Sequence, residues 1–136
     1  MALFKRKSHF EISSDIERLR RGEEVEATLA ITDPEKVGDD LKVGLVCDEL
    51  YAYEDRQMES DGPDRVVRQT ASAVAFEDWQ PATSSDPMQT FRFRVPADAP
   101  FSHEGDTLKF RWTISARDAK RMRLDPKRDK ALEVLP

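Results

Sequence analysis

The chain alternates apolar and polar residues over short stretches, which is the pattern expected of β-strands with one buried face. Residues 23–32 show it most clearly, with four apolar residues in one phase: Val25, Ala27, Leu29 and Ile31. The dipeptide Asp33-Pro34 follows directly, and proline cannot continue a ladder of backbone hydrogen bonds. This stretch is therefore predicted to be a half-buried strand that ends near residue 32.

The same pattern predicts six further strands, at residues 10–13, 41–47, 66–76, 91–95, 108–115 and 131–135. Stretch 66–76, rich in Ala, Ser and Thr, has the character of an edge strand. A bulge or the end of burial is expected near Asp48, and polar loops at 54–64 and 81–87. The basic connection after Ala116 has room for one helical turn. About seven antiparallel strands with almost no helix predict an all-β, two-sheet sandwich.

The composition fits one domain over residues 1–136, with residues 1–8 as a loosely attached start. Of the 136 residues, 38% are hydrophobic and 36% are charged, so a core can form but little apolar surface is left over. Cys47 is the only cysteine, which excludes an intramolecular disulfide and favours a small buried side chain. Neither a signal peptide nor a membrane-spanning run is visible, so the expected location is the cytoplasm.

The charge is unevenly distributed along the chain. Residues 23–64 hold fourteen acidic and three basic residues, a balance of −11, whereas residues 117–130 hold seven basic and three acidic residues, a balance of +4. Such a division bears on the choice of partner and not on the fold. Two ordinary solvated surfaces give the same division.

Four basic residues lie in the outward phase of strands 91–95 and 108–115, namely Arg92, Arg94, Lys109 and Arg111. If these strands are neighbours, the four residues form a basic face together with Arg117 and the residues after it. Such a face would dock an acidic protein segment, a phosphate-bearing partner or, peripherally, an anionic membrane. Alternatively, long basic side chains simply cover an exposed sheet. Nucleic acid is not expected, because the chain is acidic overall and has no aromatic platform between the bases.

Three aromatic residues are further candidates for contact with a partner. Trp79 precedes the loop 81–87, where it either anchors a partner or is partly buried under Pro81. Tyr51 and Tyr53 lie beyond the expected end of burial. By contrast, Trp112 and the phenylalanines at strand period are expected in the core.

Aspartates in two loops allow a second class of function, a sandwich that binds calcium or a small ligand. They are Asp33, Asp39, Asp40, Asp61 and Asp64. Their spacing fits no EF-hand, and aspartate is also an ordinary turn residue. The two histidines, His9 and His103, stand in no transition-metal motif. No metal site or cofactor is predicted.

The stretch VPADAPFSHEGDTLKFRWTISAR, residues 95–117, connects two of the core strands. Ser102 and His103 are adjacent within it, and neighbours in an extended chain point to opposite sides, which is poor geometry for a nucleophile and its base. No other motif suggests an enzyme.

The residues of this stretch carry a resemblance to a family. Phe-x-Phe-x-Val-Pro at 91–96, Ala-Pro-Phe-Ser-x-Glu-Gly at 99–105 and Trp-Thr-Ile at 112–114 resemble the arrestin-type sandwich. The chain is similar to the N-terminal lobe of bacterial sporulation-control proteins, with further likeness in residues 19–25 and 129–136. The resemblance implies an immunoglobulin-like or arrestin-like fold and a non-enzymatic interaction or scaffolding domain.

Proteins of this family have two lobes in tandem, whereas this sequence covers one. Functions that need both lobes do not carry over, and no residues here match the buried charged cluster of arrestins. Binding is predicted through an exposed sheet edge or through the basic face. A homo-oligomer formed through free edges is also consistent with the pattern.

Overall fold

A computed structural model describes residues 9–57, 65–118 and 127–136. These residues form nine strands and one short 3₁₀ helix (Pro34–Lys36). The strands are β1 (Phe10–Ser14), β2 (Arg18–Arg20), β3 (Glu24–Ile31), β4 (Leu41–Gln57), β5 (Arg65–Pro81), β6 (Met88–Arg94), β7 (His103–Glu104), β8 (Leu108–Asp118) and β9 (Lys127–Leu135).

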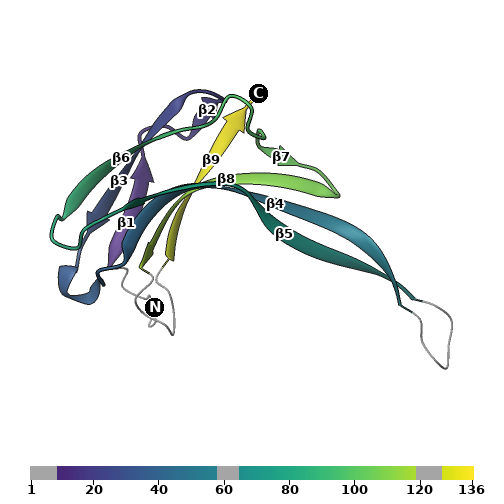
Figure 1. The fold of residues 1–136 in the computed structure, drawn as a ribbon, viewed down its shortest axis with the longest axis horizontal. Coiled ribbons are helices and arrows are strands. Elements are labelled where there is room, and N and C mark those ends of the chain that lie inside the picture. Colours follow the sequence, from purple (N-terminus) through teal and green to yellow (C-terminus); the bar gives the residue numbers. More distant parts are fainter. Residues whose placement is uncertain (1–8, 58–64, 119–126) are drawn as a thin grey trace, which may run out of the picture.

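The strands form two sheets, so the predicted all-β sandwich is confirmed (Figure 1). In the described part of the chain, the smaller sheet has the order β1-β3-β6 and the larger one the order β2-β9-β8-β4-β5, with β7 added to β8. The pairs are antiparallel except that β2 runs parallel to β9. Strands β2 and β7 are additional to the seven predicted, because three and two residues are too few to show a period.

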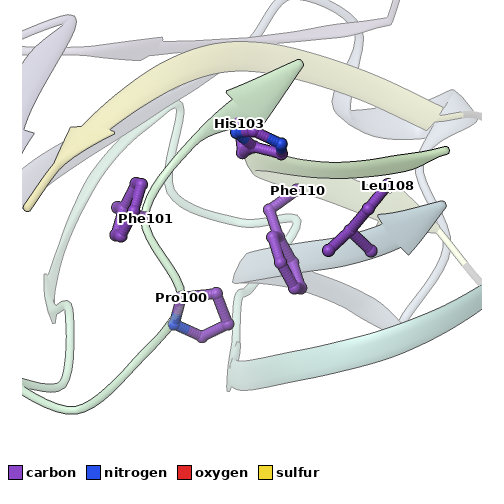
Figure 2. Close-up of a pocket in the computed structure, with 5 residues that line it drawn as sticks. All are labelled: Pro100, Phe101, His103, Leu108 and Phe110. Atoms are coloured by element: carbon purple, nitrogen blue, oxygen red, sulfur yellow. The ribbon is translucent and has the colours of Figure 1, made fainter. Parts of the chain in front are cut away.

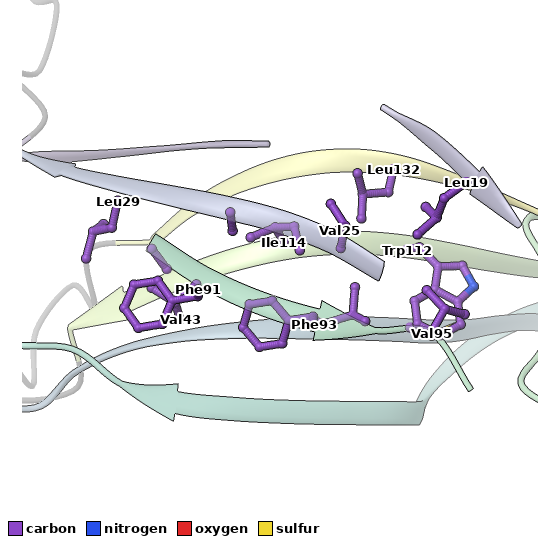
Figure 3. Close-up of a cluster of buried hydrophobic side chains, with 14 of the residues drawn as sticks. Leu19, Val25, Leu29, Val43, Phe91, Phe93, Val95, Trp112, Ile114 and Leu132 are labelled. Atoms are coloured by element: carbon purple, nitrogen blue, oxygen red, sulfur yellow. The ribbon is translucent and has the colours of Figure 1, made fainter. Parts of the chain in front are cut away.

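The core lies between the two sheets (Figure 3). The inward phase of β3 is almost fully buried, as its alternation predicts, and it faces the inward phases of β4 and β8. Trp112 on β8 is 1% exposed, and its Nε1 donates a hydrogen bond to the Pro100 carbonyl at 2.9 Å. Phe91, Phe93 and Cys47 are also buried, as predicted.

Strands β4 and β5 continue together well beyond the sandwich (Figure 1). Pairing of β4 with β8 ends at Tyr51 and Leu108, but β4 and β5 stay paired as far as Gln57 and Arg65. We call this projecting part, residues 52–57 and 65–70, the arm. A bulge or the end of burial was predicted near Asp48, and both occur there: the register shifts between Cys47 and Asp48, and the buried residues of β4 end at Cys47.

Two predicted boundaries are wrong, one in the arm and one at the other end of β5. The loop expected at 54–64 is wrong for residues 54–57, which belong to β4, and the strand expected at 66–76 extends to Pro81. A two-stranded ribbon with no second sheet over it has no buried phase, so its polar sequence looks like that of a loop. Residues 1–8, the rest of the loop and residues 119–126 of the basic connection after Ala116, where one helical turn was expected, lie outside the described residues.

Candidate interaction surface

The predicted basic face does not exist as one surface, because its residues lie in different sheets. Arg92 and Arg94 are on β6, which pairs with β3, whereas Lys109 and Arg111 are on β8 in the larger sheet. The prediction that these strands are neighbours is wrong because the connection at 95–102 crosses from one sheet to the other. Adjacent strands in sequence need not pair when a sandwich closes in this way.

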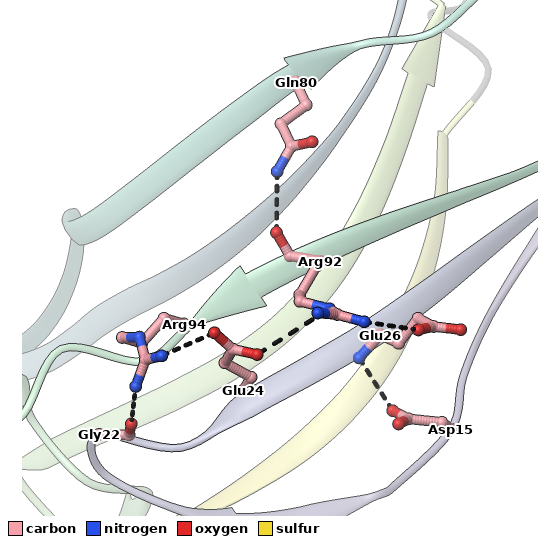
Figure 4. A network of polar contacts seen from close by, with 7 residues as sticks. All are labelled: Asp15, Gly22, Glu24, Glu26, Gln80, Arg92 and Arg94. Carbon is pink, nitrogen blue, oxygen red and sulfur yellow. Dashed lines mark hydrogen bonds and ion pairs between the residues drawn. The ribbon is translucent and has the colours of Figure 1, made fainter.

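Arg92 and Arg94 are instead paired with acidic residues of β3 (Figure 4). Arg94 Nη2 lies 2.6 Å from Glu24 Oε1, and Arg92 lies 3.9 Å from Glu24 and 3.6 Å from Glu26. Arg94 Nη1 also donates to the Gly22 carbonyl at 2.7 Å. These exposed pairs add little stability, but they leave this sheet with alternating charges and no basic patch.

Lys109 and Arg111 share an acidic neighbour on β7. Arg111 Nε lies 3.0 Å from Glu104 Oε1, and Lys109 Nζ lies 3.8 Å from Glu104 Oε2. The hydrogen bond from Arg111 lowers the pKa of Glu104, and the same bond raises the pKa of Arg111. The two positive charges of Lys109 and Arg111 and the one negative charge of Glu104 give this cluster a net charge of about +1 at neutral pH. Its attraction for an anionic partner is therefore weak.

Arg117 and Trp79 lie together on the outer side of the larger sheet. Trp79 is on β5 and pairs with Gly44, and its ring lies across that glycine. The Arg117 guanidinium is 5.2 Å and the Lys42 ammonium 4.7 Å from the ring centre, both within range of a cation–π contact. Trp79 is thus half-buried against Gly44 and not beside a loop. Its role with a partner stays a prediction.

Tyr51 and Tyr53 lie on the face of β4 that continues the core face beyond the sandwich. Their rings are 6.3 Å apart and are 40% and 47% exposed. Leu108 is opposite Tyr51 and Phe110 is opposite Glu49, so all four apolar side chains share one face. This face begins on the last paired residues of β4 and β8 and continues onto the arm, and we call it the inner face of the arm.

A hollow of about 250 Å³ lies at the base of this inner face (Figure 2). It is lined by Pro100, Phe101, His103, Leu108 and Phe110. Phe101 is 39% exposed, and the Arg21 guanidinium stands 5.5 Å from its ring centre. No function was predicted for Phe101, Leu108 or Phe110, because from the sequence Phe101 belongs to a connection and the other two to a core strand.

The outer edge of β5 is the second part of the candidate surface. β5 ends the larger sheet, as its sequence predicts, and none of the described strands pairs with its outer side. The Ala52 amide of β4 donates a hydrogen bond to the Thr107 carbonyl, so the N–H and C=O of Ala52 point away from β5. Backbone direction alternates along antiparallel strands, so Thr70, opposite Ala52, directs its own N–H and C=O outward.

Two more residues of β5 share this outward direction. Ser72 and Val74 follow Thr70 at intervals of two residues, before the bulge. Thr70, Ser72 and Val74 therefore present a row of backbone donors and acceptors at the edge. At the other end of β5, Gln80 donates to the Arg92 carbonyl at 3.0 Å and ties the strand to the smaller sheet.

Ser102 has a structural role in the described fold. Its amide donates to the Val134 carbonyl at 2.8 Å, and its hydroxyl accepts from the Val134 amide at 2.8 Å. Both bonds attach the segment before β7 to β9. The hydroxyl is thereby turned toward backbone.

The described aspartates do not gather into a metal site. Asp33 lies 3.9 Å from Lys36 and 4.0 Å from His9. Within residues 9–57, 65–118 and 127–136, no three His, Cys, Asp or Glu side chains are placed to share a metal ion. Asp61 and Asp64 lie outside the described residues. The described ranges also contain no helix long and apolar enough to cross a membrane.

The class that the fold defines is an all-β sandwich of two sheets. Among solved structures, the chain is similar to Spo0M, the sporulation control protein from Bacillus subtilis, with a TM-score of 0.48 and 14% sequence identity. The match covers 96% of this chain and 51% of that one, so this chain spans about half of its length. No family model and no curated protein matches the chain.

Proposed function

We propose that this protein is a non-enzymatic protein-interaction module that binds an extended protein segment by strand addition to the outer edge of β5. The observation that supports the proposal is the length and composition of this edge. β5 has 17 residues, and from Gln69 to Phe76 it contains no charged residue and no proline. Proteins normally protect an edge of this kind with charges, prolines or a covering element.

The inner face of the arm adds an apolar surface beside this edge. Ala71 and Ala73 of β5 lie opposite Tyr51 and Glu49, so only small side chains separate an added strand from the tyrosine. Alternate side chains of that strand would extend over Ala71 toward Tyr51, and next to Gln69 toward Tyr53. Backbone hydrogen bonds would supply the affinity, and the apolar face would select the side chains.

The alternatives are less well supported. Each of the four residues of the predicted basic face has an acidic side chain within 4 Å, which reduces its attraction for anions. The calcium hypothesis rests on aspartates that the described structure does not gather. A location in the cytoplasm belongs to the proposal and agrees with Cys47, a free and buried thiol.

The experiment replaces Ser72 by proline, which removes an outward N–H at the centre of the edge. Proteins captured from native extract are identified and purified, and their affinities for wild type, Ser72→Pro and Arg92→Glu are measured by calorimetry. Loss of binding in Ser72→Pro, with binding retained in Arg92→Glu, supports edge addition. Loss of binding in Arg92→Glu, with binding retained in Ser72→Pro, supports the basic residues as the binding site. Equal affinity of wild type and both variants rejects the edge and the basic residues alike.

Hydrogen exchange provides an independent readout with the same purified partner. The amides of Thr70, Ser72 and Val74 should become protected when the partner binds, because they are the outward donors. The amide of Ala71, which faces β4, should change much less. Protection limited to residues outside β5 would contradict the proposal.

A further inference from the structure

We infer that the segment added to β5 is β5 of a second copy of this chain, paired antiparallel about a two-fold axis through Ser72. The inference rests on the proposed function, because it uses the same edge, and it names the partner. A two-fold axis is the usual symmetry of a homodimer, and it makes the same patch face itself. The two larger sheets would then form one continuous sheet across the axis.

The backbone restricts the possible registers. Outward-facing residues of one copy must lie opposite outward-facing residues of the other, so the axis passes at position 71, 72 or 73 when the pairing is centred on the uncharged part of β5. The bulge between Cys47 and Asp48 places Phe76 opposite Cys47 and Val74 opposite Asp48, so Ala75 is the extra residue. Beyond the bulge, each residue number is therefore one ahead of its position in the ladder.

The axis at Ser72 brings opposite charges together. Counted with the bulge, Arg68 of one copy lies opposite Glu77 of the other, and the symmetry repeats this pair on the far side of the axis. Both side chains are on the outer face of the sheet, because their β4 partners Glu54 and Val46 are in the same phase. Opposite charges directly across antiparallel strands stabilise the pairing.

Both charged groups are free to form this contact. Within the described residues, Arg68 donates only to the Asp106 carbonyl, at 2.5 Å, and Glu77 accepts only from Trp79 Nε1, at 3.3 Å. Neither has an ion-pair partner among the residues that the structure describes. The guanidinium and the carboxylate therefore remain available to a neighbouring chain.

The same register also covers the exposed valines. Val66 and Val74 are 59% and 54% exposed. With the axis at Ser72, Val74 lies opposite Thr70 of the second copy, and Val66 lies opposite Trp79. Both exposed valines of each copy would therefore contact an uncharged side chain of the other copy.

The two alternative registers lose these contacts. With the axis at position 71, Arg68 lies opposite Val74 and Val66 opposite Glu77. With the axis at position 73, Thr70 lies opposite Glu77 and Arg68 opposite Trp79. Only the axis at Ser72 pairs the charges and matches the valines with uncharged neighbours, so charge complementarity selects that register.

The test combines the oligomeric state with cross-linking. Sedimentation of the full chain at high micromolar concentration should give about twice the monomer mass of 15.6 kDa. Arg68→Glu and Glu77→Arg should each weaken the dimer about tenfold or more, because each places like charges across the axis. The double variant restores opposite charges and should recover the dimer.

Cysteine variants test the register itself. Two Ser72→Cys side chains would face each other across the axis in a hydrogen-bonded pair, with Cα atoms about 5.5 Å apart, which suits a disulfide. Oxidation should therefore convert this variant into a covalent dimer. Thr70→Cys is the matched control, since its two copies are offset by about 13 Å along the strand. Mixing Thr70→Cys with Val74→Cys should again give cross-links.

The outcomes separate this inference from the proposed function. A wild-type chain that stays monomeric overturns the inference, while the function stands if Ser72→Pro still loses a captured partner. A dimer that persists in Ser72→Pro and does not cross-link through Ser72→Cys overturns the inference as well, since its interface lies elsewhere. A dimer that cross-links only through Thr70→Cys shows a different register and contradicts the axis at Ser72.

Discussion

Gly44 and Trp79 form a contact in which a glycine is required by packing and not by backbone conformation. A Cβ built on Gly44 would overlap the six-membered part of the Trp79 ring. Lys42 and Arg117 lie near the same ring, so the indole is held on the sheet from several sides. This arrangement explains why a residue with poor strand propensity stands in the middle of β4.

The first prediction concerns the free energy of unfolding of Gly44→Ala. The added methyl group must displace the indole, which should cost about 1–3 kcal/mol, as overpacking does elsewhere. Trp79→Ala should make Gly44→Ala neutral or slightly stabilising, because alanine is the better strand residue once the ring is absent. Urea unfolding of the two single variants and the double variant measures the coupling. Additive effects would show that the indole does not hold this position.

The second prediction concerns Cys47, whose environment makes the thiol hard to ionise. Burial, with Asp48 and Glu49 nearby, raises the pKa of Cys47 to about 12 from 9.0. A raised pKa means that the folded state keeps the proton after the unfolded state has lost it, so the contribution to stability declines between about pH 9 and pH 12. Unfolding curves over this range should show a smaller decline for Cys47→Ala, and a thiol reagent at pH 8 should react only on unfolding. Rapid labelling of the folded protein would contradict the assigned burial.

At the scale of elements, the backbone direction of β5 gives a third prediction. Ser72 directs its N–H outward, so Ser72→Pro should leave the ladder with β4 intact and change stability little. Ala71 lies opposite Tyr51 with its N–H toward β4, so Ala71→Pro removes a ladder bond and should cost about 1–3 kcal/mol. Thermal unfolding of the two variants compares them directly. A larger loss in Ser72→Pro than in Ala71→Pro would reverse the assigned directions.

The core strands could be predicted from the sequence because one of their phases is apolar. β3 shows this for a whole strand, since its buried residues are those that the alternation selects. The end of β4 could not be predicted, because no second layer covers the arm and no phase there needs to be apolar. The end of β5 at Pro81 could not be predicted because Glu77 and Asp78 are exposed polar residues of an edge strand. The end of burial near Asp48 was predictable because an acidic residue, Glu49, stands in the core phase of β4, which continues opposite β8 without a shift in register.

The candidate surface was predictable only in part, because pairing between distant strands is not visible in one sequence. Arg92 and Glu24 are 68 positions apart in the sequence. The local pattern shows that both side chains point outward, but it does not show that their strands pair. The exposure of Tyr51 and the edge character of β5 were predictable from local patterns. Phe101 and Phe110 were not, since a phenylalanine in a strand or turn looks the same whether or not a second sheet covers it.

At the scale of the whole molecule, the chain combines a two-layered body with a single-layered arm (Figure 1). The body buries its apolar residues between two sheets, whereas the arm has Tyr53 47% and Val66 59% exposed. A two-stranded ribbon without a second layer is marginally stable alone. The arm therefore depends on the body, and on whatever covers its edge, for its order.

This difference gives the fourth prediction, on hydrogen exchange of the free protein. Tyr53 and Gln69 are paired in the arm, and Val43 and Gln80 are paired in the body, with the same backbone direction. If the arm opens locally while the body opens only by global unfolding, its amides should exchange at least about a hundredfold faster, equivalent to about 3 kcal/mol. Exchange at several protein concentrations, followed by mass spectrometry of fragments, measures both regions.

If the exchange rates of the arm and the body differ only a little, their dependence on protein concentration identifies the cause. Protection of Gln69 that increases with protein concentration indicates that a second copy covers the arm, because only association responds to dilution. Protection that is high at every dilution would contradict the single-layered arm, since the arm would then be as stable alone as the body. Slow exchange at Gln69 in Ser72→Pro at low concentration would also show that the arm is stable alone, because that variant lacks the central donor of the edge.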